Sequence, residues 1–112
     1  MPKKVPNRKK RPKTARIAPP RETLDWIEEW IGSEVVVDVR SPFVYLGVLR
    51  GCRGEYLLLE DADAHDLRDG SASRELYIVE SREHGIHRNR KRVLVRLDEV
   101  VGISKLDDVL ME

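Results

Sequence analysis

Hydrophobic and polar residues follow two different periods along the chain, and the change of period predicts where a helix gives way to a sheet. Between residues 24 and 31, apolar side chains fall on one helical face and acidic side chains on the other. Thr23 suits the N-cap of this helix, and Gly32 is well placed to end it. We therefore predict a short N-terminal helix that carries both tryptophans, Trp26 and Trp30, and packs as a lid on the rest of the fold.

From residue 34 the period is two, which is typical of β-strands. We predict strands over residues 34–40, 43–50, 55–60, 74–80, 91–97 and 100–103. The polar residues 61–73 are expected to form a loop, and residues 81–90 a basic connection that carries histidines. Gly47, inside the second strand, indicates a sharp bend or a close backbone approach. The order of elements predicts a mainly β fold: a strongly bent five- or six-stranded antiparallel barrel with an N-terminal α-helix.

Length and composition limit the class of protein. The 112 residues, 40% of them hydrophobic and 37% charged, suit one small domain. No apolar run approaches the roughly 20 residues that span a bilayer, and the basic start leads into no apolar stretch, so we expect neither a membrane protein nor a secretory signal. The single cysteine, Cys52, cannot form an internal disulfide, which favours a reducing, cytoplasmic location.

The net charge of +1 hides a strong segregation of charge. Residues 1–21 carry nine basic residues and no acid, whereas residues 22–112 carry 12 basic and 20 acidic residues, a net charge of −8. Residues 1–20 are also rich in proline, so we expect a disordered basic tail, followed by a domain over residues 21–106 and a C-terminal tail over residues 107–112. The tail either contacts nucleic-acid phosphates or serves as a solubilising or targeting extension. Its candidate phosphate contacts are Lys3, Lys4, Arg8, Lys9, Lys10, Arg11, Lys13 and Arg16.

Two stretches of the chain match the motifs of a known family. The first comprises Trp30-Ile31-Gly32, the alternating valines 35, 37 and 39, Gly47-Val48-Leu49, and the apolar strand 57–59 that ends in Glu60-Asp61-Ala62. The second is the segment 93–100, with Arg96 and Asp98 two residues apart. With these residues in this order, the chain resembles the Sm-like (LSm) family over about residues 23–104.

The resemblance implies a small SH3-like barrel that binds RNA and associates with further copies of itself. In the family, rings form when the fourth strand of one subunit pairs with the fifth strand of the next. The segment 74–80 is an insertion that could instead cover such an edge and limit the protein to a smaller oligomer.

The chain departs from the family at the base pocket. Family members that bind uridine- or adenine-like bases present an Asp, a stacking residue and an Asn before the third strand, and an Arg-Gly pair in the second motif. Here the corresponding turn is one residue shorter: Cys52 or Arg53 stands for the Asp, Tyr56 or Leu57 stands for the Asn, and the glycine after Arg96 is Leu97. Only Arg96 carries over, and Tyr56 is either a base stacker or a core residue.

Other candidate chemistry is weaker. The carboxylates and histidine of residues 61–66, and the pair His84 and His87, lack the further ligands of a metal site, so we interpret them as solvated charges and predict neither a metal nor a cofactor. Arg50 and Arg53 would lower the pKa of Cys52, but the sequence ties no His or acid to this thiol. We predict a protein without catalytic activity.

Two functions are compatible with these features of the sequence. The first is an oligomeric Sm-like protein that binds RNA through the tail, the barrel residues Arg53, Tyr56 and Arg96, and the basic stretch that holds Arg88, Arg90 and Lys91. That stretch is either a second phosphate-contacting surface or an exposed hairpin that balances nearby acids. The second function is a protein–protein interaction module that has lost the nucleotide pocket and whose tail docks on the ribosome or another acidic partner.

Overall fold

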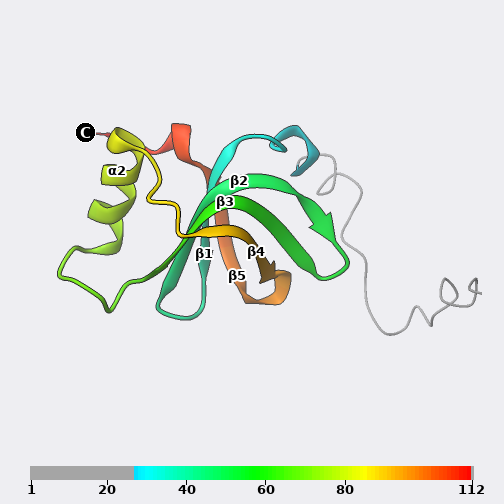
Figure 1. The fold of residues 1–112 in the computed structure, drawn as a ribbon, viewed down its shortest axis with the longest axis horizontal. Helices are drawn as coiled ribbons and strands as arrows, with labels where there is room; N and C mark the ends of the chain where they lie inside the picture. The colour runs from blue at the N-terminus through cyan, green and yellow to red at the C-terminus, as the bar shows by residue number, and fades with distance from the viewer. Residues whose placement is uncertain (1–26, 112) are drawn as a thin grey trace, which may run out of the picture.

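The computed structural model describes residues 27–111 of the chain. Five strands, one helix and two 3-10 turns follow one another (Figure 1): β1 (Glu34–Val39), β2 (Phe43–Arg53), β3 (Tyr56–Asp66), α2 (Arg74–His84), β4 (Arg90–Arg96), η3 (Leu97–Glu99), β5 (Val100–Lys105) and η4 (Leu106–Asp108). Most of the helix predicted after residue 23, including its cap and Trp26, lies outside the described residues. One helical turn at residues 27–29 is described, and Trp30 after it packs against the core.

All five strands pair antiparallel in one sheet, in the order β4-β3-β2-β1-β5. The predicted mainly β fold of five or six bent antiparallel strands is therefore confirmed, with five strands. The sheet is bent but not closed, because β4 and β5 lie at its two edges and do not pair with each other. No helix within residues 27–111 is long and apolar enough to cross a bilayer.

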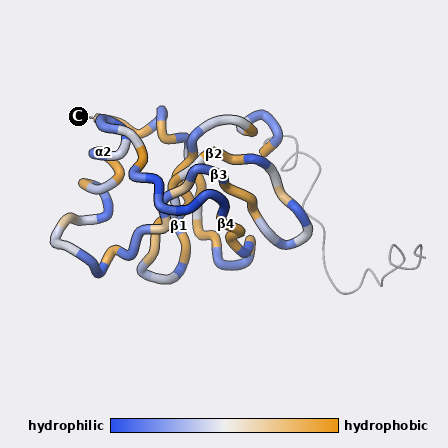
Figure 2. The backbone as a smooth tube through the Cα atoms, in the orientation of Figure 1, coloured by the Kyte–Doolittle hydropathy of each residue, from blue (hydrophilic) through white to orange (hydrophobic). Residues whose placement is uncertain are grey.

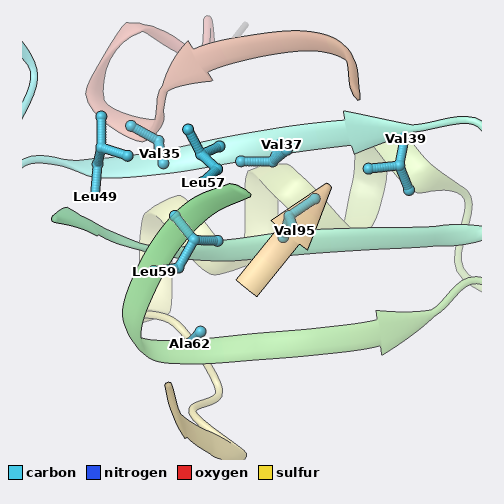
Figure 3. Close-up of a cluster of buried hydrophobic side chains, with 8 residues drawn as sticks. All are labelled: Val35, Val37, Val39, Leu49, Leu57, Leu59, Ala62 and Val95. Atoms are coloured by element: carbon cyan, nitrogen blue, oxygen red, sulfur yellow. The ribbon is translucent and has the colours of Figure 1, made fainter. Parts of the chain in front are cut away.

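The bend of the sheet is built around Gly47. The register of β2 against β3 shifts there, so that residues 61 and 62 of β3 have only Gly47 opposite them. A Cβ atom on Gly47 would lie 2.9 Å from Cβ of Ala62 and 3.1 Å from the carbonyl oxygen of Glu60, so no other residue fits without a shift of β3. Asp61 takes a left-handed φ of 49° within this bulge. The close backbone approach that Gly47 predicted is confirmed, and Figure 3 shows β3 curving beside Ala62.

Side chains from the two faces of the sheet form two separate cores. The inner face, enclosed by the bend, buries a cluster of alternating residues from β1 to β4 (Figure 3): Val35, Val37, Val39, Leu49, Leu57, Leu59, Ala62 and Val95. The opposite, outer face carries a second cluster, in which Val36, Val44 and Leu46 pack against Ile78 of α2 and Leu106 of η4. Figure 1 accordingly shows α2 and η4 together at one side of the sheet.

The structure corrects two predicted elements. Residues 74–80, predicted as a strand, form the first two turns of α2. Ser73 caps this helix by accepting a hydrogen bond from the Leu76 N–H at 3.1 Å, and Gly85 ends it. The buried residues Ile78 and Ser81 are three apart, on one helical face. Residues 61–66, predicted as part of a loop, are instead the second half of β3.

Candidate functional site

Three of the residues predicted to contact RNA lie side by side at one end of the sheet. Arg53 is the last residue of β2, Tyr56 is the first of β3, and Arg96 is the last of β4. The register pairs Arg53 with Tyr56 and Tyr56 with Arg96. Residues directly opposite each other in antiparallel strands point to the same face, with Cβ atoms about 5 Å apart. The sheet therefore assembles the three side chains into one row.

Two tight connections hold this row in place. Gly54, with a φ of 61°, makes the two-residue turn from β2 to β3 possible, because this conformation is costly for other residues. The N–H of Leu97 donates a hydrogen bond to the carbonyl of Glu55 at 2.8 Å. This bond ties the connection between β4 and β5 to the turn between β2 and β3, so the end of the sheet behaves as one unit.

The row is exposed and positively charged. Tyr56 keeps 38% of its surface in solvent, so the structure places it outside the core. Arg96 donates two hydrogen bonds to Asp98, at 3.2 and 2.8 Å, and these bonds raise the pKa of the guanidinium, which stays charged. Arg53 is exposed and forms no ion pair with any residue between 27 and 111.

The outer face continues beyond this row with residues that, apart from Arg92 of the basic stretch, the sequence did not single out as a site. Leu58 lies opposite Leu94 in the next row, and Glu60 lies opposite Arg92 in the row after that. Leu94 is 58% exposed although its neighbours Val93 and Val95 pack inward. The alternation of Arg92, Leu94 and Arg96 in β4 is the signal that could have identified this surface.

The other predicted basic residues of the body lie near the start of β4. At 3.3 Å per residue, Arg90 is about 20 Å from Arg96 along the strand. Arg88 contacts Glu34 at 3.4 Å, and Arg90 donates to the carbonyl of Asn89 at 2.9 Å. Lys91 is exposed and forms no ion pair within the described part of the chain. This hydrophilic stretch leads into β4 as a blue segment of the tube in Figure 2. The body residues predicted to contact RNA thus form two groups, one at each end of β4.

The tail residues predicted to contact phosphates, from Lys3 to Arg16, lie outside the described residues. Arg82, at the start of the basic stretch noted in the sequence, is in α2 and donates to the carbonyl of Val109 at 2.6 Å. It therefore anchors the C-terminal segment to the helix. Val109 itself packs against the second core, so the chain stays attached to the body beyond residue 106.

The polar residues of β3 considered as metal ligands are used to fix α2 instead. Asp63 is 1% exposed and accepts hydrogen bonds from the Tyr77 hydroxyl and, at 3.0 Å, from Nδ2 of Asn89. The ring of His65 stacks on that of Tyr77 with centroids 3.7 Å apart. Burial and the Asp63 carboxylate raise the pKa of Tyr77, which stays protonated. Within residues 27–111, no three His, Cys, Asp or Glu side chains come together as a metal site.

The pKa values of Asp66 and Cys52 are shifted in opposite directions, and the two shifts have different causes. Arg68 donates to both carboxylate oxygens of Asp66, at 2.9 and 2.8 Å, and lowers the pKa of Asp66 to about 2. Cys52 is half-buried against the inner core, and this burial raises the pKa of its thiol. The prediction that Arg50 and Arg53 lower the pKa of Cys52 is therefore wrong, because the thiol lies against the inner core and its burial is the cause of the shift.

Both edges of the sheet carry exposed apolar residues. Leu94 on β4 is 58% exposed, and Val101 on β5 is 68% exposed. A hollow of about 230 Å³ opens beside β4, and Tyr45, Leu94 and Arg96 are among the residues that line it. An edge strand with unpaired backbone groups and an apolar flank is a surface that favours association.

Comparison with known proteins supports the fold described above through a solved structure. No protein-family model matches the chain, and no curated protein sequence matches it. Among solved structures, the Pyrococcus abyssii Sm protein in complex with a uridine heptamer is 23% identical, with a TM-score of 0.51 over 73% of this chain and 94% of that one.

Two further Sm structures are similar to the chain at slightly lower scores. The P. aerophilum SmAP1 heptamer is 27% identical, with a TM-score of 0.49 over 72% of this chain and 88% of that one. The SmAP (LSm) protein from Methanococcus vannielii is 17% identical, with a TM-score of 0.49 over 78% and 98%. The superposition on the Pyrococcus protein, with the bent five-stranded sheet described above, shows that this chain has an Sm-like fold.

Proposed function

We propose that this chain is an Sm-like RNA-binding protein that acts without catalysis, as an oligomer, in RNA metabolism of the cytoplasm. The observation that carries the proposal is the row formed by Arg53, Tyr56 and Arg96 on an exposed end of the sheet. An exposed aromatic ring between two guanidinium groups suits a base and its flanking phosphates. The Pyrococcus Sm protein, which shares the fold, was solved in complex with a uridine heptamer.

In this proposal the basic tail and the body make different contributions to RNA binding. The eight basic residues of the tail, together with Arg88, Arg90 and Lys91 near the start of β4, supply affinity for phosphates without regard to sequence. The row at the end of the sheet holds the bases. The reducing cytoplasm as a location rests on the single cysteine.

Self-association is the second part of the proposal. β4 and β5 are the two edges of the sheet, and within residues 27–111 neither pairs with a further strand on its outer side. The two edges are different surfaces, so contact between copies is head-to-tail and leads to a closed ring or a smaller oligomer. Native mass spectrometry of the purified chain reports the number of subunits directly.

The salt dependence of RNA binding tests the proposal. We expect a fluorescein-labelled single-stranded RNA to bind the full chain with an affinity that falls steeply as salt rises. In the triple variant K9Q, K10Q and R11Q, the slope of log Kd against log salt is expected to fall by about 2, since each released counterion contributes about 0.7 on a single strand.

A matched control is R68Q, which removes an arginine already paired with Asp66 and should leave the slope unchanged. Absence of salt-sensitive RNA retention by the full chain at low ionic strength contradicts the proposal. In that case, capture of an acidic protein partner through the tail would support the alternative, a protein–protein interaction module.

A further inference from the structure

The outer face of the sheet is divided into a covered half and an open half. Over the covered half, α2 packs on Val36, Val44 and Leu46, and its Tyr77 reaches Asp63. β2 and β3 run on past Gly47 and Asp61, where the sheet bends, and α2 does not follow them. The open half consists of the outward-facing residues of the last part of β2, the first part of β3, and β4.

The open half presents an apolar centre surrounded by arginines. Its middle row joins Leu58 to Leu94, and Gly51 on β2 lies opposite Leu58, where it adds no side chain that would cover the leucines. The row on one side is formed by Arg53, Tyr56 and Arg96.

The row on the other side pairs Glu60 with Arg92, and Arg50 also contacts Glu60, at 3.0 Å. Four guanidinium groups thus border the leucines and Tyr56. Two of them, Arg50 and Arg92, share the single carboxylate of Glu60, and Asp98 holds Arg96. The border keeps an excess of positive charge in a body that is acidic as a whole.

The spacing of the rows selects a conformation of the ligand. Successive outward-facing rows are two residues apart, which is about 7 Å along a strand. Stacked bases in a duplex strand are about 3.4 Å apart, half of this distance. A nucleic acid that places one base on each row must therefore be single-stranded, with neighbouring bases unstacked.

We propose that the open half of the outer face is a binding platform for an extended single strand of RNA. One base lies on Tyr56 and the next on Leu58 and Leu94, while Arg53, Arg92 and Arg96 contact the phosphates. This inference rests on the proposed RNA-binding function and names the form of RNA and the surface that holds it. Because the contacts are ring faces and aliphatic side chains, the platform discriminates weakly among bases.

Binding of a labelled 10-nucleotide RNA to single variants of the full chain tests the platform. Y56A is expected to weaken binding about tenfold, as the loss of a stacking partner does, whereas Y56F keeps the ring and should bind as the unmodified chain does. L94A is expected to weaken binding several-fold. L76A is the matched control, because Leu76 is 48% exposed but belongs to α2, on the covered half.

Four outcomes distinguish the platform from the broader function. Losses with Y56A and L94A but not with L76A support the platform, provided that native mass spectrometry finds all variants in the same oligomer. Salt-sensitive binding that is equal in all four variants overturns the platform and leaves RNA binding to the tail. Absence of binding to every RNA overturns both the platform and the RNA-binding function. The same conclusion follows if Y56A and L94A lose a protein partner rather than RNA.

Discussion

The two halves of the outer face have the same backbone architecture, but their outward-facing side chains differ in burial. On the covered half, Val44 and Leu46 are completely buried beneath α2. On the open half, Tyr56 and Leu94 occupy equivalent outward-facing positions and remain 38% and 58% exposed. The difference arises from α2, which lies between β3 and β4 in the chain and packs on only one half. One inserted helix thus turns half of a sheet face into core and leaves the other half accessible to a ligand.

Polar contacts as well as apolar ones hold the covered half. Arg74, at the start of α2, contacts Asp38 of β1 at 2.6 Å, and Asp63 of β3 accepts from the hydroxyl of Tyr77 in α2. Each contact joins the helix to a different strand, so the position of α2 is fixed in two directions. The ion pairs of the open half, by contrast, link β-strand residues to one another and leave the surface uncovered.

The largest expected difference in the free energy of unfolding comes from truncating one leucine to alanine on each half. Leu46→Ala removes a fully buried side chain and leaves a cavity beneath α2, which should lower the free energy of unfolding by about 3 kcal/mol. Leu94→Ala removes an exposed side chain and should change it by less than about 0.5 kcal/mol. Urea unfolding followed by tryptophan fluorescence measures both variants. Equal losses would mean that the two halves do not differ in packing.

A smaller effect is expected from the hydroxyl of Tyr77. Tyr77→Phe leaves the buried carboxylate of Asp63 with Asn89 as its remaining side-chain donor and should cost about 1–3 kcal/mol in unfolding free energy. Tyr45→Phe is the control, because the Tyr45 hydroxyl makes no hydrogen bond with the part of the chain that the structure describes. A Tyr77→Phe variant as stable as the Tyr45→Phe variant would show that Asp63 does not depend on the helix.

The smallest effect concerns the cap of α2. Ser73→Ala removes the acceptor for the Leu76 N–H and should destabilise the protein by about 1 kcal/mol. Ser71→Ala, two residues earlier on the exposed loop, changes the same atoms without affecting a cap and should be neutral. Thermal unfolding followed by circular dichroism compares the two. If Ser71→Ala were the more damaging change, the start of α2 would have been misidentified.

The sequence predicted the strands better than the insertion. Alternating valines in β1 and the glycine in β2 led to the correct strands and to the correct site of the bend, because β-branched residues with a two-residue period are strongly enriched in strands. Residues 74–80 were assigned to a strand because residues 76–79 form a continuous apolar run that is too short to separate the two periods. Ser73 and Gly85 were the available signals for a helix, since they cap its two ends.

The candidate site was predicted as single residues and not as a surface. Arg53, Tyr56 and Arg96 were each named from the sequence, but they lie up to 43 positions apart, and only the register of β2, β3 and β4 makes them neighbours. Leu58 and Leu94 were missed because each lies in a continuous apolar run, 57–59 or 93–95, and such a run usually indicates burial on both faces. In this sheet the first half of β3 is covered on one face only.

The order of residues along the chain was enough to specify the class of fold, most strand positions, the bend at Gly47 and the concentration of basic residues within the first 21 positions. These properties depend on local periodicity, backbone freedom and charge, all of which can be counted along the chain. Which outward-facing residues are buried and which are exposed follows only from the packing of distant elements. That outcome depends on where α2 packs, and a contact between elements far apart in sequence leaves no local periodic signal.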